Sequence, residues 1–132
     1  MGVEDEAAGR AERGRELRAR AQGAKAEKLQ DALRSLDPEM ADWADEFIFG
    51  AVWSRPGLDF SERALVAIVA LAIGGHTEQL RNYLHGALQD GVPKEKIHEA
   101  LVMLCVYCGF PTALKALACW RDVLRAHEAS GR

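Results

Sequence analysis

The longest unbroken apolar run of the chain covers residues 64–73, and a polar, charged segment precedes it. The run belongs to a predicted helix over Ser61–Ile73, and Asp59 and Glu62 have the spacing of a capping box at its start. A helix that is apolar on every side is buried on every side. Because so small a chain can hardly cover it completely, we expect a homo-oligomer.

Two further helices, joined by a tight turn, are predicted after this run. Apolar residues recur at helical spacing over His76–Asp90 and again over Pro93–Cys108. Gly91 suits the left-handed conformation that ends a helix, and Pro93 suits the first turn of the next one. This stretch holds three of the four histidines, both tyrosines and two of the three cysteines. Any chemistry is therefore expected here.

The N-terminal part predicts two more helices. Polar, helix-favouring residues over Ala11–Leu36 predict one helix, with Gly23 as the point where it could break. Asp37 and Pro38 form a helix start, a capping carboxylate followed by a first-position proline, and we expect Gly50 to end this helix.

The remaining segments complete an all-α prediction. Residues 51–60 form a loop with a Pro-Gly turn, and a last helix is expected from Pro111, fraying after His127. No strand-period run and no solenoid-length repeat occurs. We predict a single compact multi-helix domain over residues 11–132, preceded by a disordered tail over residues 1–10.

Composition excludes several classes of partner. The 132 residues are 48% hydrophobic with a net charge of −3, and the charges are interspersed, which argues against nucleic acid. The longest apolar run is about half the length of a membrane span. The start MGVEDEAAGR has no apolar signal region, so we expect a cytoplasmic protein with three reduced cysteines.

Two polar residues lie on the inward side of the first central helix. His76 and Tyr83 share a stripe with Leu80 and Leu84, and Gln79 lies at its edge. Each of the two can donate a hydrogen bond, so both are candidate catalytic groups. Alternatively, Tyr83 is a packed ring bonded to a carbonyl and His76 merely lies near the helix start.

The opposite side of this helix carries Glu78, Arg81 and His85, in the pattern of a solvated face. In an oligomer, such a face can become one wall of a pocket between subunits. In the preceding loop, Trp53 and Arg55 could line a pocket for an anionic ligand; otherwise Trp53 is an anchor and Arg55 is solvated.

Cys105 and Cys108 form a C-x-x-C pair at the predicted C-terminal end of a helix. The helix dipole there disfavours thiolate, and the apolar surroundings raise a thiol pKa. We therefore interpret them as buried, inert thiols and disfavour a redox role. No second ligand pair has zinc-site spacing, so no metal is expected.

Four segments of the chain resemble the carboxymuconolactone decarboxylase family, over about residues 40–125. The W-x-R-P-G-L loop and the Y-C-G-x-P corner are specific to the decarboxylase branch. The four segments are FGAVWSRPGLDFSERALVAIVAL, GGHTEQLRNYLHGALQDGV, KEKIHEALVMLCVYCGFP and ALKALACW.

The resemblance implies an all-α fold that assembles into rings, trimers or hexamers, with active sites near subunit contacts. It implies a cofactor-free lyase that removes CO2 from γ-carboxymuconolactone in aromatic catabolism, leaving a carbanion delocalised into the lactone carbonyl. Such an enzyme needs a cation for carboxylates, donors for the enolate oxygen and a proton donor. The candidates for catalysis are Arg81, His76, Tyr83 and His85; those for substrate binding are Trp53, Arg55, Glu78 and Gln79.

The related alkylhydroperoxidase-like branch uses C-x-x-C-x-x-x-H on the first central helix. In this chain His76, Gln79 and Tyr83 occupy those three positions, so a peroxidase of that type is not expected. The decarboxylase branch itself usually has a histidine in place of Tyr83. Another small lactone, enol or β-keto acid, such as a biosynthetic intermediate, therefore fits as well as the name-giving substrate.

Two other functions stay open at this point. One is a ring-forming, non-catalytic protein that binds a small molecule. The other is a thiol peroxidase that uses Cys105 and Cys108.

Overall fold

The computed structural model describes residues 2–130, without the side chains of Val3 and Glu4, and its described part contains helices and no strand. The predicted all-α class is confirmed. None of the described helices has both the length and the apolar character needed to cross a membrane. In chain order the elements are α1 (Val3–Gln22), η1 (Gly23–Lys25), α2 (Ala26–Leu36), α3 (Pro38–Trp43), η2 (Ala44–Val52), α4 (Phe60–Ile73), α5 (Thr77–Gln89), α6 (Lys94–Val102), α7 (Leu104–Tyr107) and α8 (Phe110–Ala129).

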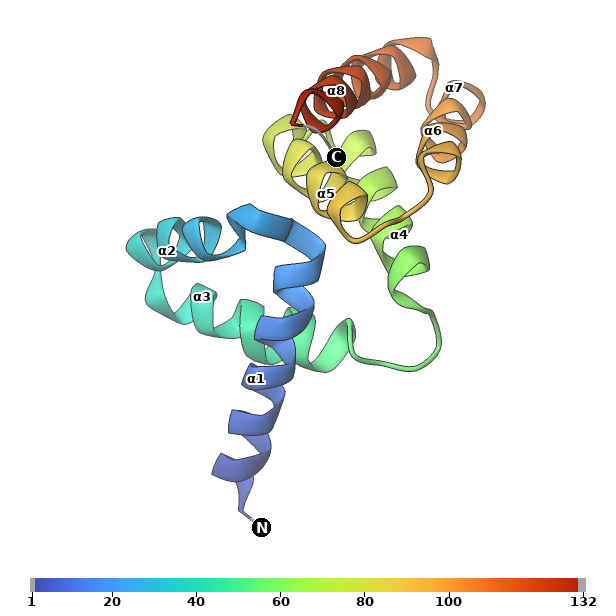
Figure 1. Cartoon of the computed structure of the whole chain (residues 1–132). Helices are drawn as coiled ribbons and strands as arrows, with labels where there is room; N and C mark the ends of the chain where they lie inside the picture. The colour runs from blue at the N-terminus through green and yellow to red at the C-terminus, as the bar shows by residue number, and fades with distance from the viewer. Residues whose placement is uncertain (1, 131–132) are drawn as a thin grey trace.

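The helices form two groups, shown in blue to cyan and in green to red in Figure 1. The first group contains α1, α2, α3 and η2, and the second contains α4 to α8. The main hydrophobic core belongs to the second group, where α5 packs between α4 and α8. Its fully buried large side chains are Ile68, Leu84, Ile97 and Leu101.

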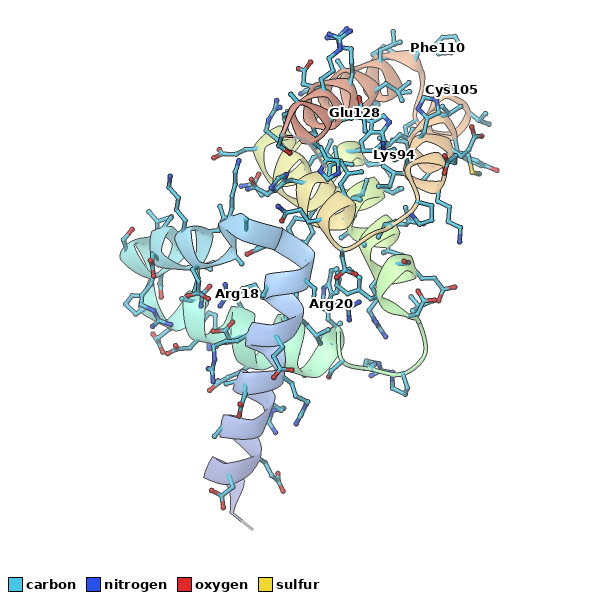
Figure 2. All side chains as sticks on the ribbon, in the orientation of Figure 1. Arg18, Arg20, Lys94, Cys105, Phe110 and Glu128 are labelled. Atoms are coloured by element: carbon cyan, nitrogen blue, oxygen red, sulfur yellow. The ribbon has the colours of Figure 1, made fainter. Side chains whose placement is uncertain are left out.

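The first group is held together by a buried arginine (Figure 2). Arg18 on α1 is 2% exposed, and its Nε donates to Asp45 Oδ1 of η2 at 2.8 Å. Its Nη1 donates to the Ala26 carbonyl oxygen, which starts α2, at 2.8 Å. Gln30 of α2 donates to the other oxygen of Asp45 at 3.2 Å. One buried ion pair thus connects three helices.

Two of the contacts that join the groups lie between the ends of α1 and α5. A Cβ built on Gly86 of α5 would overlap the carbonyl oxygen of Ala21, so glycine allows α1 and α5 to approach closely. Arg20 of α1 donates to both carboxylate oxygens of Asp90, at 3.0 and 2.9 Å. The end of α1 is therefore fixed against the end of α5.

The segment after α3 is a π-helix, η2, which the sequence pattern did not predict. Its wider turns are visible in the bond from the Trp53 amide to the Ile48 carbonyl oxygen, 3.0 Å, between residues five apart. Gly50 was expected to end the helix, and this is wrong, because the helix continues to Val52. A Cβ on Gly50 would overlap the Arg10 carbonyl oxygen, so this glycine permits the crossing with α1.

The helix starts predicted at Asp37 and Asp59 are confirmed, whereas Pro93, expected in the first turn of its helix, is the N-cap residue of α6. Asp37 accepts hydrogen bonds from the Glu39 and Met40 amides, at 2.9 and 3.1 Å. Asp59 and Glu62 form the expected capping box, with reciprocal bonds of 2.8 and 2.9 Å. The turn prediction is confirmed too, since Gly91 has a φ of 89°.

Two boundaries differ from the prediction. The helix expected over Pro93–Cys108 is divided at Met103, where the Val106 amide bonds to the Met103 carbonyl oxygen, three residues back, at 3.1 Å. Helix α1 begins at Val3, so residues 3–10 are helical where a disordered tail was expected. The break predicted at Gly23 occurs there, as the short η1. Residues 1, 131 and 132, which also fall within the domain prediction, lie outside the described part of the chain.

Replacing Asp45 by alanine will remove the buried carboxylate partner of Arg18 and leave only the exposed carboxylate of Glu27, at 3.5 Å. We expect the free energy of unfolding to fall by roughly 3–5 kcal/mol, as for other broken buried pairs. Urea denaturation followed by circular dichroism measures this. Asp42→Ala is the matched control, because Asp42 pairs with Arg34 on the surface at 3.1 Å and should contribute at most about 1 kcal/mol. Equal losses in both variants would contradict the assignment.

Candidate functional site

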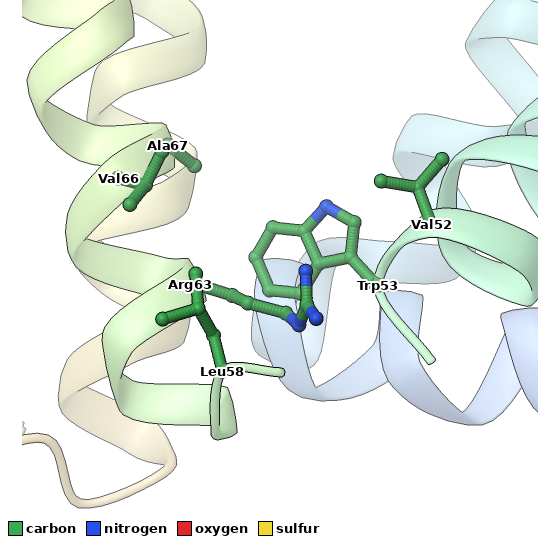
Figure 3. A pocket seen from close by; sticks show the side chains of 6 residues that line it. All are labelled: Val52, Trp53, Leu58, Arg63, Val66 and Ala67. Carbon is green, nitrogen blue, oxygen red and sulfur yellow. The ribbon is translucent and has the colours of Figure 1, made fainter. Parts of the chain in front are cut away.

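A cavity of about 210 Å³ lies where the end of η2 and the following loop face α4 (Figure 3). Four of its six lining residues are aliphatic, and the other two are an aromatic ring and a cation. The lining residues are Val52, Trp53, Leu58, Arg63, Val66 and Ala67.

Arg63 supplies the positive charge of this cavity. Its side chain extends from α4 toward the indole of Trp53 (Figure 3). Its Nη2 donates to the Arg55 carbonyl oxygen at 2.7 Å, which fixes the guanidinium. Its Nε is buried and has no hydrogen-bond acceptor within residues 2–130. A buried donor without an acceptor is costly, so a ligand oxygen placed here would be stabilised.

Trp53 is held by other aromatic rings. Its ring centroid lies 5.2 Å from Phe49, 5.6 Å from Phe60 and 6.3 Å from Tyr83, all in tilted arrangements. The guanidinium of Arg20 lies 4.1 Å from the centroid of Phe60. Because Arg20 is also paired with Asp90, the aromatic cluster is fixed by α1 as well as by α4 and α5.

Tyr83 contacts Trp53 but is not among the residues that line the cavity. Burial raises the pKa of its hydroxyl above the ordinary value of 10.0, while a hydrogen bond with Gln22 and the charge of Arg18 act in the opposite direction. The phenol therefore keeps its proton at neutral pH and can serve as a donor rather than as a base.

The other candidates predicted around Tyr83 lie elsewhere. His76 is exposed at the N-cap position of α5, where its side chain makes no capping hydrogen bond, and Glu78 and Gln79 are exposed in the first turn. Neither His76 nor Tyr83 lines the Trp53–Arg63 cavity, so these two candidates do not share a cavity with Trp53. Arg55 is exposed, and it contributes its backbone carbonyl to Arg63.

His85, on the outward side of α5, lines a different cavity together with His127 of α8. Burial lowers the pKa of His85 from its ordinary value of 6.5, and the charges of Lys25 and His127 lower it further. Arg81, one turn earlier on α5, is half-buried. Its charge acts on Cys119, whose pKa is raised chiefly by burial.

The cysteine pair lies at α7. Cys105 and Cys108 are free thiols, and both are half-buried against the core rather than fully buried as expected. Because the helix is divided at Met103, Cys105 lies in the first turn of α7 rather than at the end of a long helix. The inert character of these thiols stays a prediction.

Two residues that line these cavities, Arg63 and His127, were not among the candidates identified from the sequence. Arg63 carried a signal, since it is a cation at the start of an otherwise apolar helix. His127 carried none, because its partner His85 is distant in sequence and only the packing of α8 on α5 brings them together.

Comparison with known protein families identifies the family to which this chain belongs. The model of the carboxymuconolactone decarboxylase family matches residues 38–122. The chain belongs to that family. The match includes Trp53, Arg63 and Tyr83, whereas α1, with Arg18 and Arg20, lies outside it.

Two proteins named as decarboxylases are similar to the chain. The 4-carboxymuconolactone decarboxylase of Acinetobacter baylyi is 30% identical over 93 residues, 70% of this chain and 69% of that protein. The nitrosuccinic acid decarboxylase of Metarhizium robertsii is 35% identical over 95 residues, 69% of this chain and 66% of that protein. An uncharacterised 15.0 kDa protein of Paracoccus denitrificans is 33% identical over 88 residues, 65% of this chain and 66% of that protein.

The raised pKa of Tyr83 can be measured directly. In an alkaline titration followed by near-ultraviolet absorbance, the wild-type curve minus that of Tyr83→Phe isolates this one phenol. We expect its midpoint above 10.0, because burial favours the neutral hydroxyl. Phenylalanine keeps the packing against Trp53, so the variant should stay folded. A midpoint at or below the ordinary value would show that the ring is solvated.

Proposed function

We propose that the protein is a decarboxylase without a metal or organic cofactor, acting on a small dicarboxylate in the Trp53–Arg63 cavity. The observation that carries the proposal is the buried Nε of Arg63, a charged donor with no acceptor among the described residues, on a side chain that lines a small and mainly aliphatic cavity. The family membership and the two relatives named as decarboxylases support it.

The substrates named in those two relatives share a chemical pattern. Carboxymuconolactone and nitrosuccinic acid each carry two carboxyl groups and one electron-withdrawing oxygen-rich group, a lactone or a nitro group. Loss of one carboxyl as CO2 leaves an electron pair on carbon that the lactone carbonyl or the nitro group can accept. We infer that this chain takes a substrate of the same pattern.

In this proposal Arg63 binds the carboxylate that the product retains. A guanidinium forms charge-assisted hydrogen bonds with a carboxylate, and the bond to the Arg55 carbonyl holds it in place for this. The planar part of the substrate lies against the indole of Trp53. Orientation by these two side chains places the second carboxylate toward the aliphatic part of the lining.

The aliphatic part of the cavity favours the bond cleavage. A carboxylate beside Val66, Ala67 and Leu58 loses much of its hydration, whereas the CO2 that forms is neutral and apolar. The C–C bond breaks, its electron pair moves through carbon to the lactone or nitro oxygen, and a proton is then added to carbon. One substrate and one proton thus give one CO2 and a product with one carboxyl group fewer.

The proton donor in this proposal is Tyr83, whose hydroxyl is neutral at the working pH. Since the phenol touches Trp53 without lining the cavity, the proton must pass beside the indole, directly or through a water molecule. His76 and His85 are the alternative donors, and either would have to come from a neighbouring subunit.

We also propose that a second copy of the chain closes the cavity, within the expected trimer or hexamer. Val66 and Ile73 on α4 are 60% and 52% exposed. An apolar groove of about 420 Å³, lined by Leu65, Val66, Val69, Ala70 and Ile73, follows this side of α4. Because Val66 lines both the groove and the cavity, a copy seated on α4 would border the site and exclude water from it.

The central prediction concerns turnover. Carboxymuconolactone and nitrosuccinate are supplied separately, and CO2 release is measured for wild type, Arg63→Gln and Tyr83→Phe. We expect turnover of at least one substrate and a fall in kcat/KM of roughly 10- to 100-fold in Arg63→Gln, mainly through KM, because the bond to a carboxylate that the product retains is made in the ground state and the transition state alike. Tyr83→Phe should lower kcat more than it raises KM.

Two more arginine variants sharpen this test. Arg125→Gln, an exposed change on α8, should have no effect. Arg55→Gln tests the other arginine near the cavity and should have a small effect, because only its backbone contacts Arg63. A large loss in Arg55→Gln with none in Arg63→Gln would place the carboxylate on Arg55. Ligand-induced thermal stabilisation without any CO2 release would indicate a binding protein instead.

The assembly is tested with Ile73→Asp, which lies in the groove but outside the cavity. Because a charge in a buried apolar interface is strongly unfavourable, we expect light scattering after gel filtration to show a smaller species than wild type, with reduced turnover. Ile73→Val should keep the wild-type mass. A wild-type protein that is monomeric yet fully active would refute the closing role of the second copy.

A further inference from the structure

We propose that His85 and His127 together bind one divalent transition-metal ion, at a site separate from the Trp53–Arg63 cavity. The two imidazoles line a cavity of about 600 Å³ between the ends of α5 and α8, together with Leu88, Gln89 and Ser130. No residue of this cavity lines the other one.

The two rings are positioned to act together. Each lies on a helix whose position is fixed by the core, since Leu84 and Leu88 bury the inner side of α5 and Trp120 and Val123 bury that of α8. Both rings are half-buried, so packing restricts them while part of each still faces the cavity. Both rings line the same cavity, and the charge of His127 is among the causes that lower the pKa of His85.

The surroundings favour a cation over an anion. Helix α5 ends at Gln89 and α8 ends at Ala129, so the negative ends of two helix dipoles converge on this cavity. Gln89 and Ser130 are already engaged. The Gln89 side-chain oxygen accepts from the Ala24 amide at 2.7 Å, and the Ser130 hydroxyl donates to the His127 carbonyl oxygen at 2.7 Å. They shape the wall and leave the imidazole nitrogens as the ligands.

The ligand set selects the class of metal. Imidazole nitrogens bind zinc, nickel, copper and cobalt, whereas magnesium and calcium require oxygen ligands. Within the described residues no third histidine, cysteine, aspartate or glutamate joins the pair. Two protein ligands leave open coordination positions for water or a small ligand, as in sites that exchange their fourth ligand. The charge of Lys25, which reaches His85, opposes the ion, so moderate affinity is expected.

The two histidines that lie outside this cavity serve as controls for the proposed metal site. Of the four histidines, two line this cavity, and the other two, His76 and His98, are exposed on α5 and α6. A metal ion held by the cavity pair will depend on both of its members and on neither of the exposed ones.

The test is calorimetric titration of the untagged full chain with Zn²⁺ and, separately, with Ni²⁺. Cys105 and Cys108 are rival ligands, so all proteins carry serine at both positions. We expect one ion per chain in this background and in His98→Ala. His85→Ala and His127→Ala should each weaken binding by roughly tenfold or more, since each removes one of two ligands.

The structural control is the melting temperature of each variant without metal, and His85→Gln and His127→Gln replace any alanine variant that fails to fold. The Cu²⁺-loaded protein gives a second readout, because electron paramagnetic resonance should show two nitrogen ligands, falling to one in either variant. The proposal is overturned if no saturable binding occurs at millimolar metal, or if affinity is the same in His85→Gln, His127→Gln and His98→Ala.

Discussion

The pairing of Arg18 with Asp45 is the interaction on which the N-terminal half depends. A guanidinium that is 2% exposed must be neutralised where it lies, because removing it from water is very unfavourable. Its partners come from η2 and from the start of α2, so satisfying it fixes both relative to α1. Trp53, which lines the cavity, directly follows η2. The position of this side of the cavity therefore depends on the Arg18–Asp45 pair, in a group of helices that lies outside the main hydrophobic core.

The C-terminal group is organised differently. There the inner sides of α4, α5 and α8 meet in an aliphatic core, and polar residues are placed at the edges of that core. Tyr83 packs against this core and contacts Trp53, and Arg63 of α4 bonds to the loop at the Arg55 carbonyl oxygen. The candidate site therefore lies where the N-terminal group of helices, held by the Arg18–Asp45 pair, meets the hydrophobic core of the C-terminal group. Arg20 connects the two groups, because it is paired with Asp90 and stacked on Phe60.

Local signals in the sequence predicted the elements well. Capping chemistry located the starts at Asp37 and Asp59, and glycine located the break at Gly23 and the turn at Gly91. Features set by long-range packing were not predictable. Gly50 allows α1 to cross η2, so it did not act as a helix end. Arg63, rather than Arg55, reaches Trp53 because of how the loop folds back on α4, and His85 meets His127 only through the docking of α8.

The π-helix has a consequence for how this site can diverge among related chains. Relative to α-helical winding, a π-turn accommodates one extra residue, and each residue in a helix accounts for about 100° of rotation. Because the wider turn absorbs that extra residue, deleting one residue from η2 and restoring α-helical winding would leave Trp53 in nearly the same orientation toward Phe49 and the cavity. The gain or loss of one codon in this segment can therefore change the length of the chain before the loop without replacing the ring that lines the cavity, a kind of divergence that point substitutions do not offer.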